Sequence, residues 1–204
     1  ALMYVNGHGV FQNYFVAASC GEGWCDALEF YEINGHLLKK EEINASIGIT
    51  FSTNSEYVVI QNIDSSKAFG EITLFTKTGD FIRRYDYGAQ LRDYLFAAHV
   101  SDHVEWLLFS MFKSAYLVAG DGQILWQKPY LRIIDCRFYP EKNQLILYSM
   151  IDNSPLNESR KAISIVSLHN GEVFDTLQDV THVQFTSAGV IVKKEEIYYE
   201  YTLR

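Results

Sequence analysis

The stretch "SAYLVAGDGQILWQKPY", residues 114–130, decides the fold. It consists of two apolar segments on either side of the dipeptide Asp121-Gly122. Asp-Gly and Asn-Gly suit tight hairpin turns, because these residues adopt positive φ at little cost. The stretch therefore predicts a β-hairpin, and we expect Trp126 on its second strand to pack in the core.

Three other segments repeat this hairpin pattern. They are "ALEFYEINGHLLKKEE" (27–42), "GEITLFTKTGDFIRRYD" (70–86) and "AISIVSLHNGEVFDTLQD" (162–179). The four turn glycines are Gly35, Gly79, Gly122 and Gly171, at spacings of 44, 43 and 49 residues. A period of this size built from strand pairs is typical of a propeller blade.

A second hairpin pattern precedes each of these four hairpins, in a compressed form before the first of them as "GVFQNYFVAAS" (9–19), and it recurs once more after the last. The segments "ITFSTNSEYVVIQN" (49–62), "AHVSDHVEWLLFSM" (98–111), "CRFYPEKNQLILYS" (136–149) and "VQFTSAGVIVKK" (183–194) share a short strand, a polar turn and a longer apolar strand. Two hairpins per period make a blade of four strands, named A to D in chain order. We therefore expect an all-β, propeller-like array of four-stranded antiparallel blades at about 9–43, 48–88, 96–130, 134–178 and 181–204, forming one domain over 1–204.

The fifth predicted blade lacks its fourth strand. The apolar segment "LMYV" (2–5) precedes the first blade and is expected to supply that strand, which would close a five-bladed ring and remove its exposed edges. A β-sandwich and half of a larger propeller are the alternatives.

The hairpin "AYLVAGDGQILWQ" resembles the repeat of quinoprotein-like propellers, in which Ala, Asp, Gly and Trp recur around the C–D turn. The resemblance covers this blade; the other three keep the glycine and lose the Trp. Trp-Asp-repeat propellers are similar too, although no blade here ends in a Trp-Asp pair. The chain is thus similar to divergent members of the β-propeller superfamily, which implies a fold and leaves function open.

Composition excludes several classes of function. Hydrophobic residues make up 48% of the chain and charged residues 21%, as in a globular protein. The net charge is −8, and no basic cluster is longer than a pair such as Arg83-Arg84, so we expect no nucleic-acid binding. The sequence contains no run of 18 apolar residues, so we expect no membrane-spanning helix.

The three cysteines leave two alternatives for the cellular compartment of the protein, one reducing and one oxidising. Cys136 lies between apolar neighbours and is expected to be buried. Cys20 and Cys25 flank "GEGW" and could form a small-loop disulfide. Reduced thiols and a cytoplasmic location are the first expectation, and an extracytoplasmic location follows if that disulfide forms.

Candidate binding residues lie in the B–C and D–A links, which share one face of a propeller and vary in length here. Apolar side chains stand out in the B–C links 20–26, 64–70 and 152–161, and Tyr and Arg are frequent in the D–A links. The predicted set is Trp24, Phe69, Arg92, Tyr94, Tyr130, Arg132 and Leu156. Packing of these side chains against the blades is the alternative interpretation.

One pair of residues suggests chemistry. Alignment of the A strands places Asp135 and His182 at the same level of neighbouring blades, where an Asp–His pair could move protons or bind a metal. Such pairs more often bond to each other or to water. No zinc-ligand set, phosphate-binding glycine loop or nucleophile elbow occurs, so we expect no catalytic residues, metal site or cofactor.

These features favour a non-catalytic binding module that presents one face to a protein partner, and the acidity of the chain suits a basic one. The alternative is a carbohydrate-binding or carbohydrate-active propeller with Asp135 at the channel mouth. A glycosidase needs a second carboxylate, and Asp26, Asp93 and Asp152 are the candidates.

Overall fold

Strands form nearly all the regular structure in a computed structural model of the chain. The model describes residues 2–3, 14–21, 24–63, 71–86, 95–154 and 158–203. Within these ranges the chain divides into two compact units, residues 1–105 (unit 1) and residues 106–204 (unit 2), which are described separately. No helix in the described ranges is long and apolar enough to cross a membrane.

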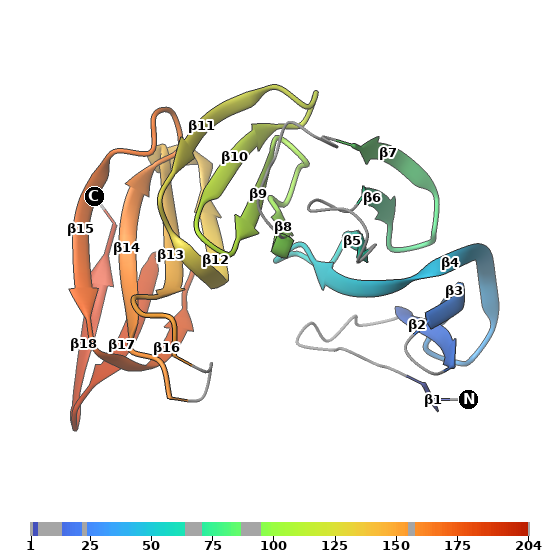
Figure 1. The fold of residues 1–204 in the computed structure, drawn as a ribbon, viewed down its shortest axis with the longest axis horizontal. Coiled ribbons are helices and arrows are strands. Elements are labelled where there is room, and N and C mark those ends of the chain that lie inside the picture. The colour runs from blue at the N-terminus through green and yellow to red at the C-terminus, as the bar shows by residue number, and fades with distance from the viewer. Residues whose placement is uncertain are drawn as a thin grey trace. The chain divides into compact units, whose positions relative to one another are not determined.

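Unit 1 contains an antiparallel sheet in the order β1-β2-β3-β4-β5-β6-β7, followed along the chain by β8 (Figure 1). The strands are β1 (Leu2–Met3), β2 (Tyr14–Gly21), β3 (Trp24–Glu32), β4 (Leu37–Phe51), β5 (Tyr57–Ile63), β6 (Glu71–Thr76), β7 (Phe81–Tyr85) and β8 (Leu95–Val100). The first part of β4 pairs with β3 and its last part pairs with β5. One continuous strand therefore serves both as the D strand of the first blade and as the A strand of the second.

Unit 2 contains the described strands from β9 to the C-terminal end, while β8, which begins the third predicted blade, falls within unit 1. The strands of unit 2 are β9 (Trp106–Met111), β10 (Ala115–Ala119), β11 (Ile124–Lys128), β12 (Leu131–Tyr139), β13 (Gln144–Met150), β14 (Lys161–Ser167), β15 (Val173–Gln178), β16 (Val180–Phe185), β17 (Gly189–Lys194) and β18 (Ile197–Thr202), with a 3-10 turn, η2 (Pro140–Lys142), between β12 and β13. The order β12-β13-β14-β15 is the four-stranded blade that the sequence predicts. The sheet β16-β17-β18 has three strands.

The repeated turn glycines are confirmed by the backbone. Gly35, Gly79, Gly122 and Gly171 all have positive φ, between +66° and +99°. Each lies in the turn that joins the third and fourth strands of a predicted blade. The Asn-Gly, Thr-Gly and Asp-Gly pairs thus mark C–D turns, as their conformational preferences indicate.

The N-terminal segment takes a different place from the one expected. Leu2 and Met3 pair with Ser19 and Cys20 of β2, so β1 lies beside the first blade. The expectation that residues 2–5 supply the fourth strand of the fifth blade is wrong for the two of them that the structure describes. A short apolar strand fits several sheet edges, and sequence alone does not discriminate between them.

Stacked sheets form separate cores inside each unit. In unit 1, side chains of β2 and β3 pack against β4, β5 and β6 around the fully buried Phe30. In unit 2, β9–β11 pack against β12–β14, and β12–β14 also pack against β16–β18. Trp126 is buried in the first of these cores, and its indole N–H donates to the Leu168 carbonyl at 3.1 Å. The expectation that Trp126 packs in the core is confirmed.

The cysteines differ in state. Cys136 is free and buried, as expected. Burial raises the pKa of its thiol well above the usual value, and the neighbouring Asp135 carboxylate adds to the rise. Cys25 is disulfide-bonded, and the backbone register pairs it with Cys20 across the β2–β3 hairpin.

Candidate binding face

The B–C and D–A links of unit 2 contact each other on one face. Between β9 and β10 the B–C turn contains Phe112, and after β11 the D–A link leads into Arg132. The Arg132 guanidinium lies over the Phe112 ring, 4.5 Å from its centroid. A guanidinium at this distance is attracted to the negative face of the ring. Two links that are separate in sequence are therefore joined by a predicted binding residue.

The backbone explains why Arg132 points toward the turn. Arg132 has φ +37° and lies in a β-bulge between Leu131 and Ile133, where the register with β13 shifts. A bulge bends its strand and redirects the side chain of the extra residue. The Ile133 N–H that follows donates to the Ser110 hydroxyl oxygen at 2.6 Å, which fixes the bulge to β9.

The next pair of links repeats this arrangement with an ion pair. Arg160 closes the B–C link before β14, and Asp179 forms the D–A link between β15 and β16. The guanidinium donates to both carboxylate oxygens of Asp179, at 2.7 and 3.0 Å. Asp179 has φ +63°, so a residue with positive φ stands at this link as well. The bidentate bonds hold the pKa of the Asp179 carboxyl below its usual value.

The base of the same B–C link is closed by its own backbone. The Ile151 N–H donates to the Arg160 carbonyl at 2.9 Å. The carboxylate of Asp152 accepts the N–H groups of Ser154 and Arg160, each at 3.0 Å, and these bonds lower the pKa of the Asp152 carboxyl. Asp152 thus connects the two described ends of this link, at Ser154 and Arg160.

The two residues selected for chemistry are both exposed. Asp135 lies on β12 and accepts the N–H of Cys136 at 2.8 Å, and His182 lies on β16 opposite Lys193. No hydrogen bond or ion pair joins Asp135 to His182, both of which are described. No group of three metal-ligating side chains occurs in the described part of the chain.

Tyr130 contributes to packing as well as to the link. Its ring lies partly buried against the core between β9–β11 and β12–β14. Burial raises the pKa of its hydroxyl. Of the other predicted binding residues, Phe69, Arg92, Tyr94 and Leu156 lie outside the described residues, as does Asp93, and for Trp24 only the backbone is described, at the start of β3.

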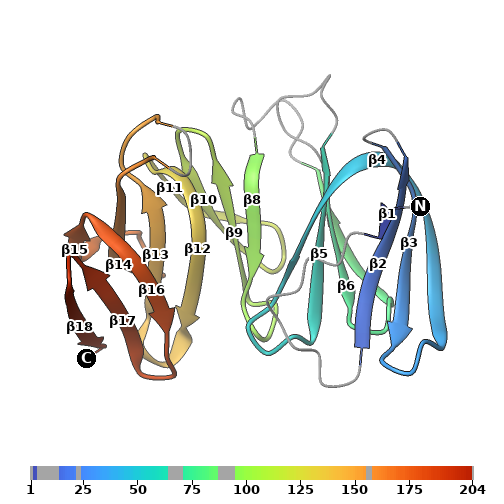
Figure 2. The same cartoon turned by 90° about the horizontal axis from the view of Figure 1, so that it is seen from below.

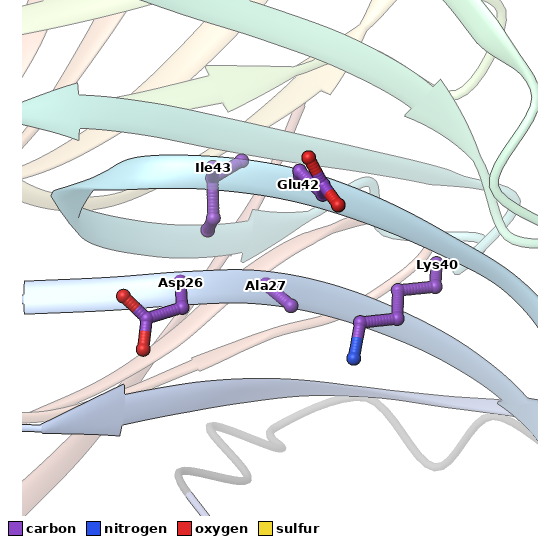
Figure 3. Close-up of a pocket in the computed structure, with 5 residues that line it drawn as sticks. All are labelled: Asp26, Ala27, Lys40, Glu42 and Ile43. Carbon is purple, nitrogen blue, oxygen red and sulfur yellow. The ribbon is translucent and has the colours of Figure 1, made fainter.

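A pocket of about 490 Å³ lies on β3 and β4 in unit 1 (Figure 3). It is lined by Asp26, Ala27, Lys40, Glu42 and Ile43. Lys40 is engaged in a 3.0 Å ion pair with Glu29 on β3. The carboxylates of Asp26 and Glu42 and the amine of Lys40 do not form a known catalytic set.

Phe112, Arg160 and Asp179 were missed as site residues by sequence reasoning. Each is ordinary in its local context, and its importance comes from a contact with a different link. A weak signal existed for Asp179, since Asp tolerates positive φ and directly follows a predicted D strand.

Comparison of the fold with known structures clarifies its class. No protein-family model and no curated protein matches the sequence. Similar solved structures are BamB from Moraxella catarrhalis (10% identity, TM-score 0.56, 96% of this chain and 59% of that chain) and the WD40 domain of Pan2 from Neurospora crassa (9%, 0.60, 89% and 55%). A protein of unknown function from Bacteroides caccae is similar as well (9%, 0.56, 89% and 66%).

The chain has a β-propeller fold. The four-stranded antiparallel sheets, and the C–D turns at the glycines that the sequence predicts, agree with the resemblance of the sequence to propeller repeats. This chain covers between 55% and 66% of the length of these three similar structures. At 9–10% identity, the likeness extends to the fold alone.

Proposed function

We propose that the protein is a non-catalytic module that binds a protein partner through the B–C and D–A links of one propeller face. The observation that carries this proposal is the pairing of these links in unit 2 by Phe112–Arg132 and Arg160–Asp179. The contacts hold aromatic and charged groups in fixed positions, and Phe112, Arg160 and Asp179 among them are exposed. Preorganised Arg and aromatic side chains are the types that dominate protein interfaces.

The predicted residues of the remaining links belong to the same proposal. Trp24, Phe69, Arg92, Tyr94 and Leu156 occupy B–C or D–A links in the sequence and are proposed to extend this face. A basic partner suits the net charge of −8, with an association rate that falls as salt rises. No observation favours the carbohydrate alternative over this one.

We also propose an oxidising compartment. The state of Cys25 supports it, because stable disulfides are rare where glutathione and thioredoxin keep thiols reduced. This replaces the cytoplasmic expectation by the alternative that was conditional on a disulfide.

The test compares two exposed phenylalanines. Phe112 lies in a B–C turn and is 37% exposed, while Phe174 lies on the outer strand β15 and is 54% exposed. Tagged wild-type, Phe112→Ser and Phe174→Ser proteins are used to capture partners from native extract, with quantitative mass spectrometry at low and high salt. We expect one partner to be retained by wild type and Phe174→Ser and to be reduced about ten-fold or more by Phe112→Ser. Equal retention by both variants would reject the loop face.

A further inference from the structure

Arg132 and Asp179 occupy equivalent positions in the two successive D–A links of unit 2. Both residues have positive φ, +37° and +63°. Each directly precedes a buried residue of an A strand, Ile133 on β12 and Val180 on β16. Strand β12 lies beside β13 and can be followed in Figure 2. The two links can therefore be compared position by position.

The two positions differ in how their charge is met. The Asp179 carboxylate accepts two hydrogen bonds from Arg160 of the adjacent B–C link. The B–C turn beside Arg132, residues 112–114, contains an aromatic ring and a base and no acid. The link between the third and fourth blades thus has an aromatic contact where the next link has an ion pair, and the positive charge of Arg132 is not met by its B–C turn.

The guanidinium of Arg132 is anchored on one side. It lies over the Phe112 ring, and the bulge that carries it is fixed to β9 by the bond between Ile133 and Ser110. Among its nitrogens, only Nε is buried without a hydrogen-bond partner. A planar guanidinium held in this way presents its terminal N–H groups to an incoming acceptor in a fixed orientation.

The acidic side chains of unit 2 do not neutralise Arg132. The undescribed residues of this unit, 155–157 and 204, are Pro, Leu, Asn and Arg, so all of its Asp and Glu side chains are described. The ion pairs of the described part of unit 2 involve other bases, and none of these carboxylates pairs with Arg132. An acceptor for its terminal N–H groups therefore has to come from outside unit 2.

A carboxylate suits this position better than a phosphate group does. Both groups accept two parallel hydrogen bonds from a guanidinium. A phosphate carries up to two negative charges and is usually bound by a cluster of bases. The chain has a net charge of −8, and a single arginine in it matches the single charge of a carboxylate.

We propose that the terminal N–H groups of Arg132 bind a carboxylate of the protein partner, from an Asp or Glu side chain or from its C-terminus, with apolar partner atoms against the exposed Phe112 ring. This inference rests on the loop face proposed above and gives the chemistry of one contact in it. An acid at this position is compatible with a partner that is basic overall, because charges across an interface are matched locally.

Two libraries of short random peptides serve as the probe. In one library both peptide ends are blocked, and in the other the C-terminus is free. Each library is selected for binding to the 204-residue protein. We expect the selected peptides to share an Asp or Glu in the first library if the acceptor is a side chain, and to come only from the second library if it is a C-terminal carboxylate. Selection of no peptide, or of peptides without a required carboxylate, would overturn the proposal.

Synthetic copies of a selected peptide then test the contact. The carboxylate is kept or replaced by the corresponding amide, and binding is measured by isothermal titration calorimetry with wild type, Arg132→Gln and Arg83→Gln. Arg83 is an exposed arginine on the outer strand β7 of unit 1 and provides the same charge change. We expect wild type and Arg83→Gln to bind the acid peptide about ten-fold or more tightly than the amide peptide, and Arg132→Gln to bind both equally weakly.

The comparison of the two peptides on wild-type protein does not depend on the folding of a variant. Equal binding of acid and amide peptides by wild type, equal losses in the two variants, or tighter binding of a phosphoserine peptide would each contradict the proposal. Phe112→Ser separates this failure from failure of the loop face. Peptides that need Phe112 and ignore Arg132 would leave the loop face standing, whereas peptides that ignore both would count against it as well.

Acids of unit 1 outside the described residues are tested as occupants of the same guanidinium. They are Glu22, Asp64 and Asp93. The combined variant Glu22→Gln, Asp64→Asn, Asp93→Asn should bind the acid peptide as tightly as wild type does. A several-fold gain in affinity would mean that one of these acids competes for Arg132, and a dimer that Arg132→Gln dissociates in sedimentation equilibrium would assign the carboxylate to a second copy. Either result would rule out an acceptor from a different protein.

Discussion

At the scale of single residues, Gly35 and Gly79 have the same backbone conformation and different surroundings. Their φ values are +87° and +89°. A Cβ at Gly35 meets nothing within 4 Å, whereas a Cβ at Gly79 would lie 2.7 Å from the ring of Phe30. Phe30 is fully buried and has little room to move. The first glycine is therefore needed for its φ alone, and the second also for the space it leaves.

This pair gives a stability prediction with an internal control. We expect Gly35→Ala to lower the free energy of unfolding by about 1 kcal/mol, the cost of a positive φ for Ala. Gly79→Ala should lose a further amount of about 1–3 kcal/mol, because the methyl group displaces a packed aromatic ring. Urea denaturation followed by circular dichroism measures both. Equal losses in the two variants would show that Phe30 adapts without cost.

The same residue scale shows what sequence can and cannot predict. The glycine turns are recognised because the preference for positive φ belongs to the residue itself. The stacking of Arg132 on Phe112 depends on a bulge and on the contact of two links, and neither is a local property. Sequence therefore predicted Arg132 as a candidate without predicting its neighbour.

At the scale of elements, Arg160 and Asp179 connect a B–C loop to a D–A link by side chains that are both largely exposed. The hydrogen bonds from Arg160 lower the pKa of the Asp179 carboxyl in the folded state. A carboxyl whose folded pKa is lowered stabilises the fold above its ordinary pKa, and this contribution is lost as the pH falls through the lowered value. The connection is thus expected to hold at neutral pH and to weaken in acid.

A carbon-13 NMR titration of the Asp179 carboxyl tests this connection. In wild type the pKa should lie below the ordinary value for Asp, and Arg160→Gln should move it upward. Arg84→Gln, which removes the arginine of a different ion pair, should leave it unchanged. Added salt should reduce the shift, because the pair is exposed to solvent. An unshifted pKa in wild type would mean that the two links are not joined in solution.

Element boundaries were the less predictable part of the fold. The sequence indicates a break near residues 43–48 between the first and second blades, yet β4 runs through it from Leu37 to Phe51. Pairing partners change along β4 while its backbone stays extended, so no turn residue marks the transition. The sequence predicts the wrong sheet for the N-terminal strand β1 for a related reason, since its apolar residues fit the edge of more than one sheet.

At the scale of the whole molecule, repetition made the architecture readable. Turn glycines at a nearly constant spacing and apolar strands between them predict four-stranded sheets, and the structure contains them. Function is less readable, because propellers share a scaffold and differ in their loops. The loops of this chain carry exposed Phe, Arg and Asp side chains whose partners become apparent only in three dimensions.

The oxidation state of the three cysteines can be decided by counting the reactive thiols of the protein. Cys25 is disulfide-bonded and Cys136 is free, with a raised thiol pKa and a buried side chain. Since the thiolate is the reactive form, the folded protein should show no rapid reaction with Ellman's reagent at about pH 8. Unfolding in urea should expose one thiol per chain, and reduction before the assay should raise the count to the three cysteines of the sequence.

Cys136→Ser provides the control for this count. The variant should show no reactive thiol in urea without reductant, because only the disulfide-bonded cysteines remain. Protein purified from its native compartment with alkylation in denaturant at lysis is the decisive sample, since all thiols that were free in the cell, the buried Cys136 included, are then blocked before air can oxidise them. Alkylation of all three cysteines in that sample would return the protein to a reducing compartment, while alkylation of Cys136 alone would support an oxidising one.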